Sequence, residues 1–358
     1  MPVLFASKSA IAAFRNATSL DVEARSVDNL FDDVSGNMLV LSLFLLVRTL
    51  LTLAALNLGR AGRSTAGIYS TSNALPDVLV CALTKVSRRS TTWVALVHHL
   101  PEDQHSNYRT SFHRVLSLFS YAVAVRLITR FADVVVAYHR PTIARLSSSG
   151  LPGSRLVINA NGVDLTEIEA AARSAGSRRA NVAVCIGRLS QQKGIPVLLR
   201  VWAEVSRSRP EARLTIVGAE DELTRQEVID IAKSLGVADS ILVRGVLPRQ
   251  AVLSELLTAR VMIAPSFVEG WGLSVLEGLA CGTPVVGWDL EAYQPFRPAI
   301  VTAGVADASS FAANIIRILE SDTWWEELSA SSRNLSLSFS WDRVANEEWR
   351  ILREEFGP

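Results

Sequence analysis

Cysteine is scarce in this sequence. Three of the 358 residues are cysteines, and Cys81, Cys185 and Cys281 stand far apart. Their odd number and wide spacing exclude a disulfide framework and a cysteine metal site, so we interpret them as reduced core residues. Cys281 stands beside a glycine, but with no histidine nearby in the sequence we do not expect a reactive thiol there.

Charge of either sign is not in excess. The chain has 36 basic and 35 acidic residues, which give a net charge of +1 at pH 7. This balance excludes an overall attraction to nucleic acid or to an anionic membrane, so a basic site must be local. The length exceeds what one hydrophobic core commonly holds, and we expect two domains.

Glycine is missing from the N-terminal segment between Met1 and Arg25. This absence excludes a glycine-rich phosphate loop in that segment. Residues 21–27 are typical of a strand, and residues 9–19 of a helix that precedes it. We therefore expect the N-terminal domain to lack its first strand and a glycine-rich loop, either through a truncated gene start or through divergence.

Residues 38–58 form a long apolar run with few interruptions. The length could span a bilayer, but Arg48 at its centre would cost about 2.5–3.5 kcal/mol there. We favour a buried or half-buried helix of the first domain, and the alternative is an apolar face that rests on a membrane. The start of the chain lacks the continuous apolar run of a cleavable signal peptide.

The most informative segment that is present runs from Glu269 to Glu277, two carboxylates on either side of a Gly-Trp-Gly turn. The preceding residues 260–264 are typical of a buried strand, and residues 274–280 of a helix. The free N–H groups at the helix start form an anion site. A ligand with both a phosphate and a sugar fits this arrangement, although Ser274-x-x-Glu277 also matches a helix capping box.

A second strand and loop carry two cations. Residues 182–186 are typical of a buried strand, and Gly187, Arg188 and Lys193 lie in the loop that follows. Pro196 suits the first turn of the next helix. Two cations beside a departing diphosphate can stabilise the negative charge that develops on it.

Strands and helices alternate through the rest of the C-terminal half. Predicted strands cover residues 213–218, 241–245 and 283–287, with a helix over residues 248–259. Such alternation predicts a doubly wound parallel α/β sheet, in which ligands bind at the carboxyl ends of strands. Both proposed phosphate loops lie at such ends.

Together these motifs resemble the donor site of retaining nucleotide-sugar glycosyltransferases of the GT-B fold, family 4 type, with its Glu-x7-Glu signature. The resemblance implies two Rossmann-like domains that face each other across a cleft. It also implies that the donor site is built from two loops that contain Gly187, Arg188, Lys193, Glu269, Gly270, Trp271, Gly272, Leu273 and Glu277. In one departure, Ala219-Glu220-Asp221 stands where the family commonly has a second glycine.

The resemblance assigns roles to these side chains. Arg188 and Lys193 would stabilise the departing diphosphate, Glu269 would orient sugar hydroxyls, and Glu277 would hold the ribose. The sequence has no Asp-x-Asp, the pair that metal-dependent transferases often use. We therefore expect no metal site and no cofactor, with a UDP-linked or GDP-linked sugar as substrate.

The N-terminal half contributes a histidine. The predicted strand Thr92–Val97 ends at His98, where the family has a histidine that contacts the transferred sugar. Adjacent side chains of an extended strand face opposite ways, so at most one of His98 and His99 lines the cleft. We favour His98 as a catalytic residue, the alternative being a structural histidine.

The resemblance also divides the chain. We expect an acceptor-side domain over residues 1–165, a linker over 166–180, a nucleotide-sugar domain over 181–340 and a helix over 341–358 that crosses back to the first domain. The expected partners are a nucleotide sugar and a glycan or lipid-linked acceptor, with no nucleic acid. The expected location is the cytoplasm, with peripheral membrane contact through the N-terminal domain as an option.

Two other classes of function stay open. The first is a non-catalytic or regulatory homologue that binds nucleotide sugars, which the missing glycine loop favours. The second is a sugar phosphorylase on the same scaffold, which would use inorganic phosphate in place of a nucleotide.

Overall fold

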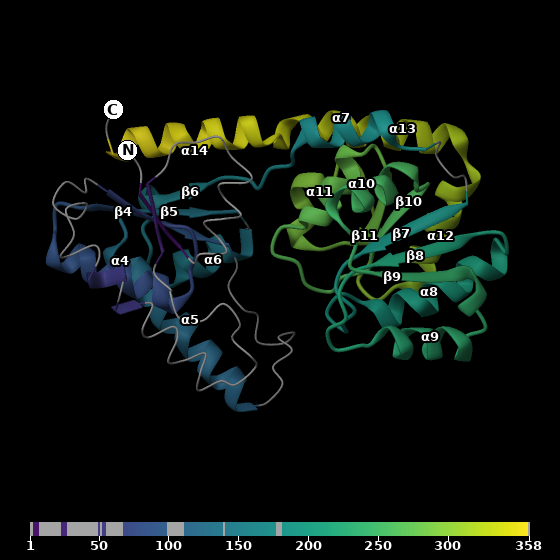
Figure 1. Ribbon diagram of the computed structural model, residues 1–358, viewed down its shortest axis with the longest axis horizontal. Helices are drawn as coiled ribbons and strands as arrows, with labels where there is room; N and C mark the ends of the chain where they lie inside the picture. Colours follow the sequence, from purple (N-terminus) through teal and green to yellow (C-terminus); the bar gives the residue numbers. More distant parts are fainter. Residues whose placement is uncertain are drawn as a thin grey trace.

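The computed structural model describes residues 3–6, 23–26, 49–50, 52–54, 67–98, 111–138, 140–176 and 181–356. These residues form two α/β domains, and a long C-terminal helix extends from one domain over the other (Figure 1). His99, the end of the predicted linker and most of the apolar run at 38–58 lie outside the described residues.

The N-terminal domain is built on a parallel sheet with the strand order β3-β4-β5-β6. Its strands are β3 (Gly67–Ser70), β4 (Thr92–Val97), β5 (Val134–Ala137) and β6 (Leu156–Ile158), and its helices are α4 (Leu75–Ser87), α5 (Ser111–Phe131) and α6 (Arg140–Ser148), with the 3-10 turn η1 (Gly153–Arg155) before β6. The two central strands are almost entirely apolar and buried, as expected of parallel strands that are covered on both faces.

A first strand is present, contrary to our expectation. Strand β1 (Val3–Ala6) pairs in parallel with β2 (Glu23–Ser26), which lies within the predicted strand at residues 21–27. The prediction that the first strand is missing is therefore wrong. The glycine pattern misled it, because a run as short as Val3-Leu4-Phe5 can form a strand without a glycine loop after it. The two strands form a sheet of their own.

The C-terminal domain contains a six-stranded parallel sheet with the order β12-β11-β10-β7-β8-β9. Its strands are β7 (Val182–Ile186), β8 (Arg213–Val217), β9 (Ile241–Gly245), β10 (Val261–Ala264), β11 (Val285–Trp288) and β12 (Ile300–Ala303). The predicted strands at 182–186 and 241–245 are confirmed to the residue. The chain builds outward from β7 through β8 and β9, then returns to place β10 on the other side of β7. This reversal creates a crevice between β7 and β10, the place where Rossmann-type sheets bind ligands.

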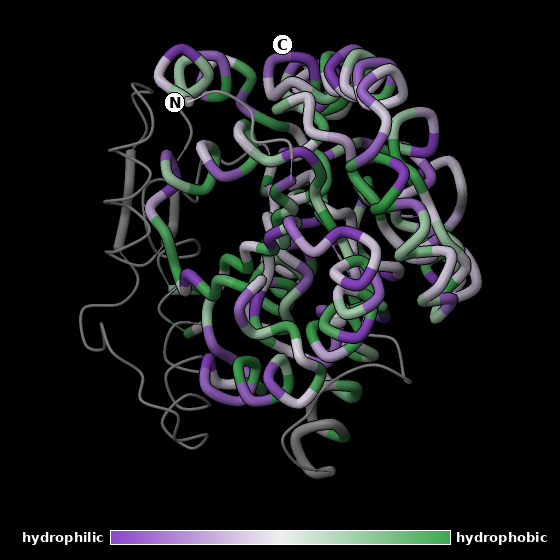
Figure 2. The backbone as a smooth tube through the Cα atoms, turned by 90° about the vertical axis from the view of Figure 1, so that its right-hand side faces the viewer, coloured by the Kyte–Doolittle hydropathy of each residue, from purple (hydrophilic) through white to green (hydrophobic). Residues whose placement is uncertain are grey.

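Helices cover both faces of this sheet. Helices α8 (Ile195–Ser208), α9 (Arg225–Ser234) and α12 (Ala308–Glu320) share one hydrophobic core, and α10 (Arg249–Thr258) and α11 (Leu273–Ala280) lie in the other (Figure 1). The remaining elements are α13 (Asp322–Ser336) and the 3-10 turns η2 (Ala238–Ser240), η3 (Glu291–Phe296) and η4 (Leu337–Phe339). Figure 2 shows that hydrophilic and hydrophobic residues alternate within the turns of the peripheral helices, as amphipathic helices require.

Two helices connect the domains. Helix α7 (Leu165–Ser174) occupies much of the predicted linker and packs against α10 of the C-terminal domain. Helix α14 (Trp341–Phe356) runs over the N-terminal domain, where it contacts β4 (Figure 1). Glu348 of α14 accepts hydrogen bonds from the Tyr69 hydroxyl and the Asn159 amide. The C-terminal helix is thus hydrogen-bonded to β3 and to the residue that follows β6.

Candidate functional site

Two strand-to-helix loops meet at the crevice between β7 and β10. The Phe267 amide donates a 3.0 Å hydrogen bond to the Gln192 carbonyl, which joins the two loops directly. Gly194 has φ +70°, and a Cβ atom there would lie 2.0 Å from the Pro265 carbonyl oxygen. Glycine is therefore required for this close approach of the loops.

Lys193 and Glu269 are brought together by this contact. The Lys193 Nζ atom lies 2.6 Å from Glu269 Oε1, and the two side chains are 22% and 12% exposed. A carboxylate so well buried needs a charge partner or hydrogen-bond donors to remain ionised at low cost. The ammonium of Lys193 supplies this partner.

Arg188 lies in the same loop with a partner of its own. Its guanidinium forms a 2.6 Å ion pair with Asp221, and the Arg188 side chain is 57% exposed. The Gln191 amide also donates to the Glu222 carboxylate at 2.8 Å. Two acidic residues that follow β8, Asp221 and Glu222, thus bind the loop that contains both cations.

The Gly-Trp-Gly turn leads into helix α11. Gly272 is the N-cap residue, with φ +88°, and no side chain caps the helix start. The capping-box alternative for Ser274 and Glu277 is therefore wrong, because the helix begins too early for that pairing. Uncapped backbone N–H groups at a helix start favour anions, as the sequence predicted for this loop.

Glu277 is held by a cation instead. Its carboxylate forms an ion pair with Arg249, which also binds Glu167 of α7 at 3.1 Å. Arg249 was missed by the sequence analysis, since it lies at the start of a different helix and belongs to no motif. The contacts make Arg249 a positioning residue for the Glu277 carboxylate.

Trp271 faces the interior more than the solvent. Its indole is 7% exposed and makes edge contacts with Phe296, Phe339 and Tyr138, at centroid distances of 5.6, 5.9 and 6.4 Å. Tyr138 belongs to the N-terminal domain, so these rings join the two domains. Of the other predicted donor-site residues in this turn, Gly270 is half-buried and Leu273 is exposed.

His98 lies at the carboxyl end of β4 and is exposed. Its Nε2 lies 2.9 Å from the Thr71 carbonyl, which can only accept, so this nitrogen carries the proton. The ring lies 5.4 Å from that of Tyr138, which in turn contacts Trp271. One aromatic ring therefore separates His98 from the turn between Glu269 and Gly272.

Tyr293 is a further residue that the sequence analysis missed. It lies in η3, after the strand next to β10, and is 1% exposed. Its hydroxyl has no hydrogen-bond partner among the described residues. Burial, followed by the charges of Glu269 and Cys185, raises the pKa of the phenol well above its usual value. The sequence did contain a signal for Tyr293. Residues that follow a parallel strand lie near the same edge of the sheet as those that follow its neighbour, so a residue shortly after β11 is expected near the loop after β10.

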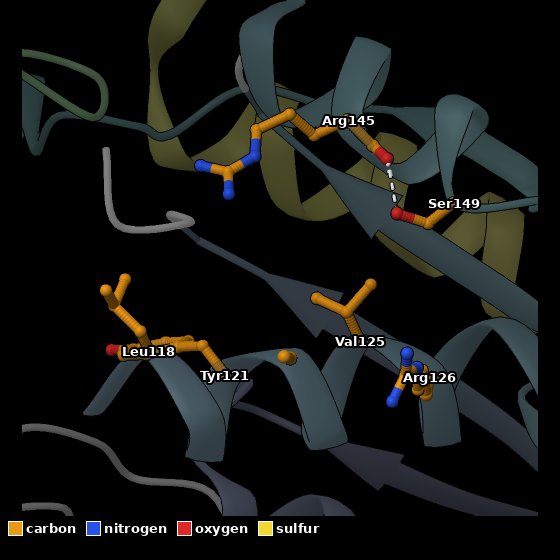
Figure 3. A pocket seen from close by; sticks show the side chains of 7 residues that line it. Leu118, Tyr121, Val125, Arg126, Arg145 and Ser149 are labelled. Atoms are coloured by element: carbon orange, nitrogen blue, oxygen red, sulfur yellow. Dashed lines mark hydrogen bonds between the residues drawn. The ribbon is translucent and has the colours of Figure 1, made fainter. Parts of the chain in front are cut away.

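A separate pocket lies in the N-terminal domain, between α5 and α6 (Figure 3). It has a volume of about 380 Å³ and is lined by Leu118, Tyr121, Ala122, Val125, Arg126, Arg145 and Ser149. None of these residues belongs to the two loops of the C-terminal domain, so the pocket is distinct from the predicted donor site.

Within the described residues, no group of three or more His, Cys, Asp or Glu side chains is placed to hold a metal ion. Over the same residues, every helix is too short or too polar to cross a membrane.

Comparison of the whole chain with solved structures defines its class. The structure of HepE from Anabaena in complex with UDP matches 99% of this chain and 100% of that chain, with a TM-score of 0.74 at 17% identity. The structure of sucrose-phosphate synthase from Thermosynechococcus elongatus matches 99% of this chain and 96% of that chain, with a TM-score of 0.73 at 18% identity. The fold is therefore GT-B, as the sequence predicted.

Residues 168–334 match the family described as glycosyl transferases group 1. It is this part of the chain, a little under half of its length, that is similar to that family. The D-inositol 3-phosphate glycosyltransferase of Thermobifida fusca is 28% identical over 240 residues, 61% of this chain and 54% of that protein. The GDP-mannose-dependent alpha-(1-6)-phosphatidylinositol monomannoside mannosyltransferase of Mycolicibacterium smegmatis is 34% identical over 177 residues, 46% of each. The chain thus spans about half the length of these curated relatives.

Proposed function

We propose that the chain is a retaining glycosyltransferase that moves a sugar from a nucleotide sugar to a hydroxyl acceptor. The observation that carries the proposal is the Lys193–Glu269 pair, a cation and a carboxylate 2.6 Å apart at the crevice between β7 and β10. A nucleotide sugar offers an anionic diphosphate directly bonded to a hydroxylated ring. The pair presents one group suited to each part.

The diphosphate would lie between the two loops. Lys193 and Arg188 come from one loop, and the uncapped start of α11 comes from the other. As the bond to the sugar breaks, negative charge grows on the diphosphate, and preorganised cations and N–H groups lower the barrier. This arrangement takes the role that a divalent metal has in other transferases, so we propose transfer without a metal.

The remaining groups hold the sugar and the ribose. Glu269 accepts hydrogen bonds from sugar hydroxyls. Glu277 accepts hydrogen bonds from the ribose, and its ion pair with Arg249 holds the carboxylate in position. His98 lies one aromatic ring away from the same turn, in the N-terminal domain, and contacts the transferred sugar. Its Nε2–H is bonded to the Thr71 carbonyl, so Nδ1 accepts a hydrogen bond from a sugar hydroxyl. The sugar keeps its anomeric configuration because donor and acceptor react on the same face.

The relatives suggest which substrates to test. One relative is named as GDP-mannose-dependent and acts on a phosphatidylinositol mannoside, and another is named for D-inositol 3-phosphate. A solved structural neighbour was crystallised with UDP-glucose. We propose a UDP-linked or GDP-linked hexose as donor and an inositol phosphate or inositol lipid as acceptor.

The experiment is a transfer assay on the full chain. UDP-glucose and GDP-mannose are each combined with D-inositol 3-phosphate or with phosphatidylinositol in micelles, and products are identified by mass spectrometry and their anomeric configuration by NMR. We expect one donor to give an α-linked product. A product with inverted configuration would contradict the retaining mechanism. Binding of a nucleotide without turnover on any acceptor would favour the non-catalytic homologue instead.

A further inference from the structure

The environment of Glu269 raises a question about the donor-bound state. The carboxylate is 12% exposed and pairs with Lys193. The proposed function requires the Lys193 ammonium on the diphosphate. Glu269 would then be a buried carboxylate whose positive partner has turned toward another anion, an arrangement that costs free energy unless another donor replaces it.

Tyr293 supplies a donor at this place. Its side chain is 1% exposed, and its hydroxyl has no hydrogen-bond partner among the described residues. Leaving such a group unsatisfied carries a cost of its own, so a buried hydroxyl without a partner calls for an explanation. A phenol O–H can donate to a carboxylate, and a hydrogen bond to a charged acceptor is among the stronger ones.

The backbone of the site makes room for this ring. A Cβ atom at Gly272 would lie 2.8 Å from Cε1 of Tyr293, and one at Gly287 would lie 3.1 Å from Cε2. The hydroxyl-bearing end of the ring is thus fixed between the start of α11 and strand β11. Gly272 ends the turn that begins at Glu269, so the ring packs against the same turn that contains this carboxylate.

We propose that Tyr293 is the reserve hydrogen-bond donor of Glu269, which binds the carboxylate when Lys193 turns to the diphosphate of a bound nucleotide. The exchange rests on the proposed function. It keeps Glu269 ionised and oriented toward the sugar while the cation serves the leaving group. Tyr293 is a positioning residue in this scheme, since it acts through Glu269 and does not touch the reacting atoms.

The first test needs no ligand. Tyr293→Phe removes the hydroxyl and keeps the ring, and Lys193→Met removes the charge and keeps the stem. In the wild-type background the hydroxyl has no partner, so Tyr293→Phe should not lower the melting temperature of the full chain. In the Lys193→Met background the hydroxyl has become the partner of Glu269, so the same change should lower the melting temperature by roughly 3 °C or more.

A third background is a control for this comparison of melting temperatures. In Lys193→Met/Glu269→Ala the carboxylate of residue 269 is gone, and Tyr293→Phe should again not lower the melting temperature. Equal effects of Tyr293→Phe in all three backgrounds would overturn the proposal.

The second test uses UDP and GDP, titrated by calorimetry into the wild type and Tyr293→Phe. We expect the variant to bind the nucleotide about tenfold more weakly, the scale of one hydrogen bond to a charged group, with an unchanged melting temperature when free. Tyr121→Phe, in the remote pocket of the N-terminal domain, is the matched control and should keep wild-type affinity.

The two proposals fail in different ways. If the wild type binds the nucleotide and Tyr293→Phe binds it equally well, the exchange is overturned and the proposed function stands. If the wild type binds neither UDP nor GDP, the proposed function is overturned. The exchange of donors at Glu269 is then overturned as well, because no nucleotide binds to draw Lys193 away.

Discussion

Arg188 and Asp221 form an ion pair with a distance of 2.6 Å between their charged groups. The cation that we assign to the diphosphate is therefore already engaged by a carboxylate of the neighbouring loop. Both side chains are partly exposed, so the pair is weak and a dianionic ligand can compete for Arg188. Asp221 occupies the segment in which this chain departs from the family's glycine pattern.

The Asp221 pair predicts a gain in affinity. In Asp221→Asn the competing charge is removed, and we expect the dissociation constant for UDP or GDP to fall by up to about fivefold, because exposed ion pairs contribute at most about 1 kcal/mol. Calorimetric titration at fixed salt measures this change. Asp230→Asn on α9 has the same charge change at an ion pair with Lys233 and is the control. Weaker binding by Asp221→Asn would show that Asp221 holds Arg188 in its binding position.

The two glutamates of the donor loop should differ in what they affect. Glu269→Gln should lower kcat with the sugar donor by about 10²-fold without weakening the binding of the free nucleoside diphosphate, because Glu269 is assigned to the sugar and its charge competes with the diphosphate for Lys193. Glu277→Gln should weaken binding of the nucleotide itself by about tenfold. Steady-state kinetics and titration separate the two effects. An equal loss of nucleotide affinity in both variants would refute this division of roles.

The donor loops could be predicted from the sequence because their signals are local. Apolar runs such as Val182–Ile186 mark strands that are buried on both faces, and a loop after such a strand lies at a known edge of the sheet. The same logic placed both loops at the carboxyl edge of the sheet, for which chain connectivity and strand polarity suffice. The family resemblance, and not this logic, assigned Lys193 and Glu269 to one donor site.

The partners of these residues could not be predicted in this way. Arg249 and Asp221 reach the site from other loops, and nothing in the pattern of their own segments fixes the direction of a side chain. Tyr293 lies in a 3-10 turn without hydrophobic periodicity. Strand β1 (Val3–Ala6) was overlooked because four residues are too few for a clear alternating pattern.

The contact between α14 and the first domain should contribute to stability. In Tyr69→Phe the Glu348 carboxylate loses a hydrogen-bond donor, and we expect the free energy of unfolding to fall by about 1–2 kcal/mol. Chemical denaturation of the full chain measures the loss. Tyr293→Phe is the matched control, since its hydroxyl has no partner among the described residues and its removal should cost nothing. Equal denaturation midpoints for wild type and Tyr69→Phe would show that the bond contributes nothing.

Transfer should persist in the presence of a chelator. Because Arg188, Lys193 and the start of α11 take the role of a metal at the diphosphate, 5–10 mM EDTA, roughly the usual working range, should leave the rate of sugar transfer unchanged. The assay compares initial rates with and without EDTA. Complete loss of transfer that Mn²⁺ or Mg²⁺ restores would reveal a metal requirement.

The most direct test of the donor site is calorimetric titration of UDP and GDP into the wild type, Arg188→Ala and Lys193→Ala. We predict that the wild type binds one of the two nucleotides and that each variant binds it at least about tenfold more weakly, since each loses one cation at the diphosphate. Arg200→Ala removes an equal charge from an exposed position of α8 and should bind as the wild type does. Affinities in both site variants that equal that of the wild type would contradict the assignment of the diphosphate to these loops.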